Sequence, residues 1–246
     1  MGHRSGAGRG RKARGARGVG TRILRHWLKL AAKILIALFL GLLLSILLFR
    51  FVDPPITTVM LVEKLKGHTL RRVWVPLERI SPQLPLAVIA AEDGRFCQHW
   101  GVDWGAVRDA IQESQGRGFL RGASTIPMQT AKNLYLWTWR SYLRKILEAP
   151  LAYAISAVWP KQRVMEVYLN IVQWGPGVFG AEAASRYHFN KSASQLTRRE
   201  AALLAASLPN PRVRNAGKPG VRLSRIAGAI ERRMPVIAGR ADCVRR

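Results

Sequence analysis

The stretch VIAAEDGRFCQHWGVDW (residues 88–104) places two adjacent carboxylates, Glu92 and Asp93, directly after an apolar run. The run LAVIAA predicts a buried helix, on which Glu92 and Phe96 would share one face and Asp93 would be offset by about 100°. A carboxylate partly enclosed by apolar side chains tends to have a raised pKa, which suits a general base near neutral pH. The same two residues also fit plain ion pairs with Arg95 and other cations at a helix end, because structural ion pairs are commoner than catalytic ones.

A second charged group follows in RKILE (residues 144–148). On a helix Arg144 and Glu148 are i, i+4 neighbours, and Lys145 and Glu148 are i, i+3 neighbours, so two cations and one acid share a face. The pattern is equally typical of a surface salt bridge, which contributes only a few tenths of a kcal/mol.

Between these two groups lies GRGFLRGASTIPMQTAKN (residues 116–133), which is rich in glycine, cations and hydroxyl groups. Backbone N–H groups, Ser and Thr hydroxyls and Lys132 are the groups that hold phosphate oxygens in proteins. The segment matches neither a Walker A loop nor a dinucleotide fingerprint. Its composition alone is therefore a weak indication of a phosphate site.

The chain of 246 residues is strongly basic, with 40 Lys and Arg against 14 Asp and Glu and a formal charge of +26. Such a balance indicates an anionic partner: nucleic acid, a membrane surface or a phosphate-bearing substrate. Its two cysteines, Cys97 and Cys243, match no metal spacing and no redox motif. So sparse a pair is interpreted as two unrelated thiols, although the sequence does not decide whether they pair.

ILIALFLGLLLSILLF (residues 34–49) contains no charge, and with its flanks it is long enough to cross a bilayer. We expect an uncleaved transmembrane helix over residues 27–52, because FVDPPITT offers no cleavage site; the alternative is a buried core helix. The acid-free basic tail of residues 1–26 is expected to be disordered and cytoplasmic. A nucleic-acid-binding arm would also fit this tail, but the adjacent span explains its charge more simply.

Beyond the anchor the pattern predicts a linker over residues 53–79 and a mainly helical domain over residues 80–240. Helix starts are indicated by Ser81 with Pro82, by Asp103, and by a capping box from Thr197 to Glu200. Pro150 is expected to kink or break a long apolar helix. KQRVMEVYLNIV (residues 161–172) reads as an amphipathic helix, and alternating apolar residues occur only around RRVWVPL (residues 71–77).

Five motifs, EDGRFCQHWGVD, GASTIPMQTAKNLYL, RKILEAPLA, KQRVMEVYLNIVQWG and GVFGAEAASRYHFNKSASQLTRREAALLAASLPNP, stand in the order found in one enzyme family. In these motifs the chain resembles the family-51 peptidoglycan glycosyltransferases over roughly residues 80–235. No penicillin-binding domain follows, so the chain is similar to the monofunctional form. The resemblance implies a mainly α, lysozyme-like glycosyltransferase domain behind one N-terminal transmembrane helix.

The resemblance also implies the reaction. Lipid II is polymerised onto a growing glycan chain, the linkage is inverted, and undecaprenyl pyrophosphate leaves. It implies Glu92 as the base, Asp93 as its aide and Glu148 as the second catalytic glutamate. The substrate-binding residues that match the family are Ser124, Thr125, Gln129, Lys132, Asn133, Arg144 and Lys145. His99 and Asn170 are expected to have supporting roles.

A divalent cation, usually magnesium, commonly assists in the family, without an organic cofactor. The implied partners are lipid II, the growing glycan, membrane lipids and other cell-wall synthesis and division proteins, with no nucleic acid. The implied location is the inner membrane, crossed once, with the N-terminus cytoplasmic and the catalytic domain periplasmic.

The second motif departs from the usual STITQQ or STISQQ, because Pro127 and Met128 replace polar residues, so no polar role is expected at these two positions. Pro150 is also unusual there. Two other functions remain alternatives. A cell-wall hydrolase would also use a lone glutamate, but it has no pyrophosphate for the cations to hold. A non-catalytic membrane scaffold would use the basic tail as its working part.

Overall fold

The computed structural model describes residues 12–114, 124–139 and 141–244, and these divide into two units, residues 1–48 and 49–246. The first unit consists of helix α1 (Lys12–Phe49), whose part Leu24–Phe49 is long and apolar enough to cross a membrane. Nearly all large apolar side chains of this part are exposed, as a lipid-facing helix requires. The helix begins at Lys12, where the sequence predicts a disordered tail up to residue 26.

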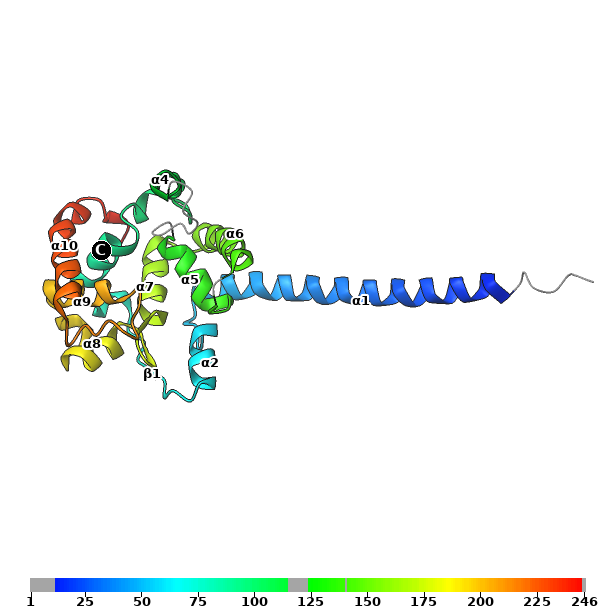
Figure 1. The fold of residues 1–246 in the computed structure, drawn as a ribbon, viewed down its shortest axis with the longest axis horizontal. Helices are drawn as coiled ribbons and strands as arrows, with labels where there is room; N and C mark the ends of the chain where they lie inside the picture. The colour runs from blue at the N-terminus through cyan, green and yellow to red at the C-terminus, as the bar shows by residue number, and fades with distance from the viewer. Residues whose placement is uncertain (1–11, 115–123, 140, 245–246) are drawn as a thin grey trace, which may run out of the picture. The chain divides into compact units, whose positions relative to one another are not determined.

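The second unit is mainly helical, as predicted (Figure 1). Its α-helices are α2 (Thr58–Leu65), α3 (Gln83–Glu92), α4 (Trp104–Ser114), α5 (Ile126–Tyr135), α6 (Tyr142–Val158), α7 (Lys161–Ile171), α8 (Ala181–Phe189), α9 (Arg198–Ser207) and α10 (Val221–Ala238). Four short 3₁₀ turns accompany them: η1 (Leu77–Arg79), η2 (Phe96–Gln98), η3 (Ala193–Gln195) and η4 (Asp242–Val244).

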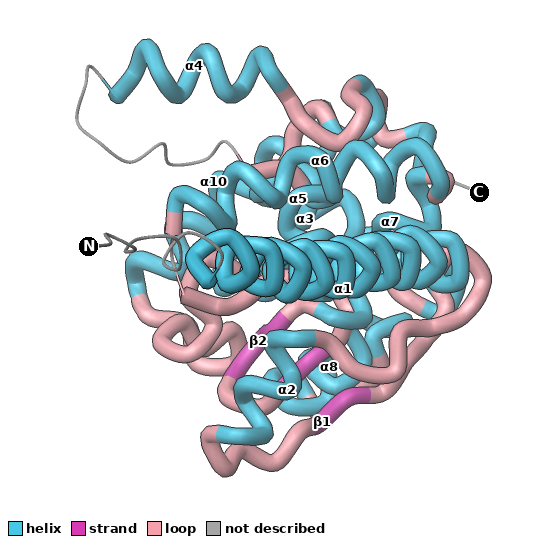
Figure 2. Tube along the Cα trace, turned by 90° about the vertical axis from the view of Figure 1, so that its right-hand side faces the viewer, coloured by secondary structure: helices cyan, strands magenta, loops and turns pink. Residues whose placement is uncertain are grey.

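A small sheet has the strand order β1-β3-β2, from β1 (Arg71–Arg72), β2 (Gln173–Gly175) and β3 (Val178–Phe179). β1 runs parallel to β3, and β2 pairs with β3 antiparallel. The sheet, α2 and α8 gather at the lower edge of the domain in both views (Figures 1 and 2). Strands of two or three residues leave no alternating pattern in a sequence, and β2 and β3 were not predicted.

The core has two packing groups, α3 against α9 and α10, and α5 against α6 and α7. α7 is buried on nearly every side from Val164 to Ile171, so the prediction of an amphipathic helix is wrong for this part. Such a helix lies inside a domain rather than on its surface. α7 therefore forms a rigid support beneath α5.

Several helices begin at or near the residues that the sequence predicts. Asp103 accepts a hydrogen bond from the Ala106 backbone N–H, and the capping box at the start of α9 is present. α3 begins one residue later than predicted, at Gln83. Pro150 lies inside α6 and does not break it.

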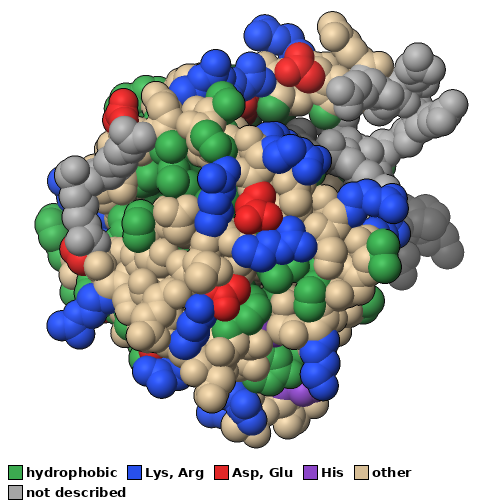
Figure 3. Space-filling model, turned by 90° about the vertical axis from the view of Figure 1, so that its left-hand side faces the viewer, with side chains coloured by type: hydrophobic (Ala, Val, Ile, Leu, Met, Phe, Trp, Pro, Cys, Tyr) green, Lys and Arg blue, Asp and Glu red, His purple; other side chains and the backbone are tan. Residues whose placement is uncertain are grey.

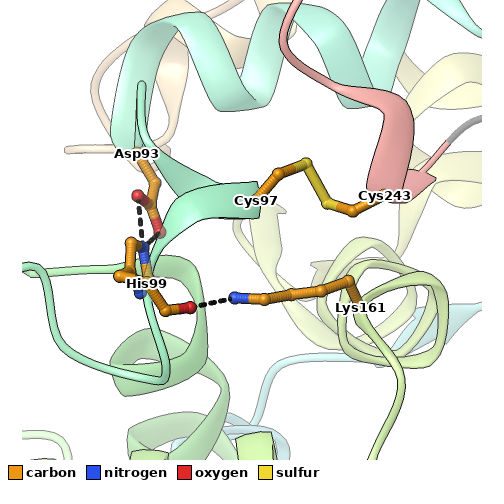
Figure 4. The surroundings of a disulfide bond; sticks show 5 residues. All are labelled: Asp93, Cys97, His99, Lys161 and Cys243. Atoms are coloured by element: carbon orange, nitrogen blue, oxygen red, sulfur yellow. Dashed lines mark hydrogen bonds and ion pairs between the residues drawn. A yellow bond between two sulfur atoms is a disulfide. The ribbon is translucent and has the colours of Figure 1, made fainter.

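Cys97 and Cys243 form a disulfide that joins η2 to η4, so the interpretation as two unrelated thiols is wrong (Figure 4). Their Cα atoms are 5.6 Å apart across 146 positions of sequence. Spacing along the chain carries no information about contacts at such a separation.

Candidate active site

Glu92 is the last residue of α3, and its carboxylate accepts a hydrogen bond of 2.8 Å from Gln129 Nε2 on α5. Burial raises the pKa of Glu92, while the Gln129 hydrogen bond and the charges of Lys132 and Arg214 act in the opposite direction. A half-buried glutamate whose pKa is raised accepts a proton more readily than an ordinary carboxylate, as a general base requires. α3 ends at Glu92, so Phe96 lies on η2 and not on the same helix face, in contrast to the prediction.

Asp93 lies directly after α3, but its carboxylate turns to other partners. It accepts hydrogen bonds from the Ile126 backbone N–H at 2.9 Å and from His99 Nε2 at 2.9 Å (Figure 4). The first of these bonds places a negative charge at the N-terminus of α5, where the helix dipole favours it. Asp93 therefore fastens the end of α3 to the start of α5.

Arg95 is the partner of neither Glu92 nor Asp93. Its guanidinium binds Asp103 at 2.8 Å and Asp109 at 3.4 Å. The alternative of ion pairs with Arg95 and other cations is therefore wrong for Arg95, whereas Asp93 does contact the His99 ring.

His99 supports this arrangement through both its side chain and its backbone. Its carbonyl accepts a hydrogen bond of 2.7 Å from Lys161 Nζ (Figure 4), and the Lys161 ammonium also lies 4.5 Å from the centre of the Phe96 ring. Burial lowers the pKa of Lys161 to about 8, against the attraction of Asp93. The turn that follows the acidic pair is thus held by α7 on one side and by the disulfide on the other.

The second motif forms the first turns of α5. Thr125 is buried and caps the helix, accepting from the Met128 N–H and donating to the Gly101 carbonyl, so its hydroxyl is already occupied. Pro127 lies in the first turn, where a missing N–H costs nothing. Met128 packs in an apolar cluster with Val102, Ala152, Val107 and Ala149.

Further along α5, Gln129 and Lys132 lie near Glu92, whereas Asn133 is buried. Burial lowers the pKa of Lys132, and the carboxylates of Glu148 and Glu92 raise it in turn. In the part of the chain that the structure describes, no hydrogen bond or ion pair occupies the Lys132 ammonium. Lys132 therefore lies close enough to both glutamates for their charges to act on its pKa.

RKILE forms a buried ion cluster and not the surface salt bridge that the sequence also allowed. Glu148 is 2% exposed, and it binds Arg144 and, at 3.0 Å, Lys145. Lys145 Nζ also donates to Ser124 Oγ at 2.5 Å, which joins α6 to the residue before α5. The cluster thus connects Glu148, Arg144 and Lys145 to Ser124, whose carbonyl lies 3.4 Å from Gln129 Nε2.

Two further residues near Glu92 were not singled out from the sequence as parts of the site. Tyr168 on α7 donates a hydrogen bond of 3.0 Å to Gln129 Oε1. Arg214, in the loop after α9, donates to the Ala206 carbonyl and lies near enough to lower the pKa of Glu92. Tyr168 lies within the fourth sequence motif, so the motif could have identified it as a site residue. Arg214 lies in none of the five motifs, and nothing in its neighbouring sequence indicates a role.

Asn170, near the end of α7, has the predicted supporting role. Its amide donates to the Val75 carbonyl at 2.8 Å and accepts from the Val75 N–H at 3.0 Å. Asn170 thereby holds the segment before α3 against α7.

Together these groups offer one carboxylate with a raised pKa, Glu92, and a set of cations beside it. Such an arrangement can take a proton from a hydroxyl nucleophile while it stabilises an anionic leaving group. Within the described ranges, no group of three or more His, Cys, Asp or Glu side chains could hold a metal ion.

The Transglycosylase family profile matches residues 59–238. A protein named biosynthetic peptidoglycan transglycosylase in Agrobacterium fabrum is 53% identical over 190 residues, which cover 77% of this chain and 84% of that protein. One of the same name in Pseudomonas fluorescens (strain Pf-5) is 46% identical over 230 residues, covering 91% and 95%. The matched range, residues 59–238, includes the site residues described above.

Proposed function

The chain belongs to the Transglycosylase family, and on that premise we propose that this peptidoglycan glycosyltransferase polymerises lipid II with release of undecaprenyl pyrophosphate. The observation that carries the proposal is the combination of a half-buried carboxylate with a raised pKa, Glu92, and a neighbouring set of cations, Lys132, Arg144 and Lys145. A base alone would serve many reactions. A base together with cations suits a hydroxyl nucleophile and a phosphate leaving group.

In the proposed step, the 4-hydroxyl of N-acetylglucosamine attacks the anomeric carbon of N-acetylmuramic acid on the growing chain. The hydroxyl proton passes to Glu92 as the new C–O bond forms. The bond from the anomeric carbon to pyrophosphate breaks, and its electron pair leaves with the pyrophosphate. General-base catalysis of this kind contributes about 10²–10⁴-fold in rate.

Lys132, Arg144 and Lys145 are assigned to the pyrophosphate. Arg144 and Lys145 are already fixed by Glu148, so they stabilise developing charge with little reorganisation. Glu148 acts in this scheme by holding the two cations. Asp93 acts by fixing α5, on which Gln129 and Lys132 lie. Magnesium remains part of the expectation from the family, but no step here is routed through it, since no donor set for it was found among the described residues.

We place the catalytic domain in the periplasm and propose that one transmembrane helix anchors it in the inner membrane. The apolar helix Leu24–Phe49 supports the anchor, and the ten cations of residues 1–33 support a cytoplasmic N-terminus. The Cys97–Cys243 disulfide supports an oxidising compartment for the domain.

Contact with membrane lipids is supported by apolar side chains on the first turns of α6. Tyr142, Leu143 and Ile146 are each at least 60% exposed, and Trp139 just before the helix is 66% exposed. Aromatic and aliphatic side chains together are typical of a surface that meets the membrane interface. Other cell-wall synthesis and division proteins are further proposed partners.

The test is incubation of the purified full chain with labelled lipid II in detergent or vesicles. Formation of glycan polymer with release of undecaprenyl pyrophosphate is the expected result. Cleavage of finished glycan without polymer would identify a hydrolase instead. Neither product would leave a membrane scaffold as the function.

A further inference from the structure

Tyr168 is a fully buried tyrosine that contacts Gln129, the hydrogen-bond partner of Glu92. It lies on α7, is 0% exposed, and its hydroxyl donates to Gln129 Oε1 at 3.0 Å. Gln129 Nε2 in turn donates to Glu92 Oε2 at 2.8 Å. A chain of hydrogen bonds therefore runs from Tyr168 on α7 through Gln129 to the Glu92 carboxylate.

The Tyr168 hydroxyl determines which way the Gln129 amide faces. An amide has one acceptor end and one donor end, and a phenol that donates to Oε1 turns Nε2 toward Glu92. Reversal of the amide would bring Oε1 against an ionised carboxylate, where two acceptors would face each other without a proton. The other contact of Nε2, to the Ser124 carbonyl, is long at 3.4 Å and fixes the amide weakly.

The Tyr168 hydroxyl keeps its proton throughout the working pH range. Burial, together with the nearby charges of Glu92 and Asp93, raises the pKa of Tyr168 well above that of an ordinary tyrosine. The hydroxyl is therefore always able to donate, and its oxygen can also accept.

We propose that Tyr168 is a positioning residue for Glu92. Tyr168 acts through the Gln129 amide, whose orientation it adjusts to the protonation state of Glu92. While Glu92 is ionised, Tyr168 donates to Oε1 and Nε2 donates to the carboxylate. Once Glu92 has taken the proton, the amide can reverse, so that the Glu92 O–H donates to Oε1 and Nε2 donates to the Tyr168 oxygen. Both ends of the Gln129 amide keep a hydrogen-bond partner in each state, whereas the Tyr168 hydroxyl changes from donor to acceptor toward the amide. The inference rests on the proposed function of Glu92.

The experiment compares Tyr168→Phe with the wild type in lipid II polymerisation across pH. Phenylalanine keeps the ring and removes only the hydroxyl, so Gln129 Oε1 loses its donor and Nε2 is held less firmly against Glu92. We expect kcat near neutral pH to fall about fivefold, the effect of about one hydrogen bond, with KM within about twofold. We also expect the acid limb of the pH profile to move to higher pH.

Tyr187→Phe is the matched control, because Tyr187 is a 46% exposed tyrosine on α8, outside the site. Its profile should overlay the wild type. A double-mutant cycle with Gln129→Met tests the route of action: Tyr168→Phe should have no further effect once Gln129 is replaced.

An unmoved acid limb, or an equal effect of Tyr168→Phe in the Gln129→Met background, would overturn the inference. Failure of Tyr168→Phe to fold would overturn it too, because the hydroxyl would then be needed for structure. The Glu92→Gln variant distinguishes a failure of the inference on Tyr168 from a failure of the proposed function. If Glu92→Gln is inactive and the limb is unmoved, only the inference on Tyr168 is lost; if Glu92→Gln is active, the base assignment is lost.

Discussion

At Glu92, burial and neighbouring donors act on the carboxyl pKa in opposite directions, and burial is the larger influence. The base works only when it is ionised, so activity should be lost as pH falls through the raised pKa. We therefore predict an acid limb of kcat/KM above 4.5, the ordinary value for glutamate. A pH profile measured with saturating and limiting lipid II checks this, and an acid limb at or below the ordinary value would contradict it.

Lys132 offers a cleaner test of the phosphate assignment than Arg144. Removal of Arg144 would leave the buried Glu148 short of a partner and would destabilise the fold as well. We predict that Lys132→Met weakens the use of lipid II by about tenfold or more in kcat/KM, since one charge-assisted contact contributes about 1.5–3 kcal/mol.

Lys64→Met on α2 is the control for Lys132→Met, because it removes an exposed lysine outside the site. Its kinetics should match the wild type. Unchanged lipid II kinetics in Lys132→Met would remove Lys132 from the phosphate site.

At the scale of elements, the site depends on how α3, α5 and α6 meet. Gly101 lies at φ 91°, and a Cβ there would stand 2.8 Å from the Ala152 backbone in α6. The Gly101 carbonyl also accepts from the Thr125 cap of α5. One glycine thus allows the turn after the acidic pair to approach α6 and cap α5 together.

The disulfide between η2 and η4 should stabilise the catalytic domain. A disulfide that closes a long loop contributes about 2–4 kcal/mol, and about 2–4 °C of Tm follows from each kcal/mol at this size. We predict that Cys97→Ser with Cys243→Ser lowers Tm by about 4–16 °C. Thermal unfolding of the wild type with and without reductant gives the same comparison, and equal Tm values would contradict it.

Sequence patterns predicted those elements whose signals are local. The capping box of α9, the Asp103 cap and the apolar run of α3 each depend on neighbours within a few positions. The pairing of Cys97 with Cys243 and the placement of Arg214 near Glu92 depend on contacts between distant segments. For the same reason the partners of Arg95 and the burial of Glu148 could not be decided from the sequence alone.

At the scale of the whole molecule, the segment that follows the anchor is bound to the catalytic domain by arginines. Arg163 on α7 donates to the carbonyls of Phe49 and Val52 and pairs with Asp53 at 3.0 Å. Arg72 donates to the carbonyls of Pro54 and Pro55. These contacts order residues 49–55 against the domain.

We predict that Arg163→Met frees this segment. Amide exchange over residues 50–56 should become faster, and Tm should fall, because Arg163 also pairs with the part-buried Glu166. Arg222→Met, at an exposed position on α10, should change neither. Unaltered exchange in Arg163→Met would show that other contacts hold the segment.

The strong positive charge is spread over the domain as well as the tail. Figure 3 shows a face on which Lys and Arg side chains outnumber Asp and Glu. A charge so distributed favours encounter with anionic membranes and phosphate-bearing substrates. It agrees with a substrate that carries pyrophosphate at a membrane surface.

The most direct test of the central claim is polymerisation of lipid II by the full-chain Glu92→Gln variant. The account predicts no polymer from a protein that is as stable as the wild type or more so. The raised pKa means that the folded state holds the proton more tightly than the unfolded state, so stability falls as pH rises above the ordinary value and glutamine removes this loss. Polymer formed by folded Glu92→Gln at a rate near that of the wild type would contradict the assignment of Glu92 as the base.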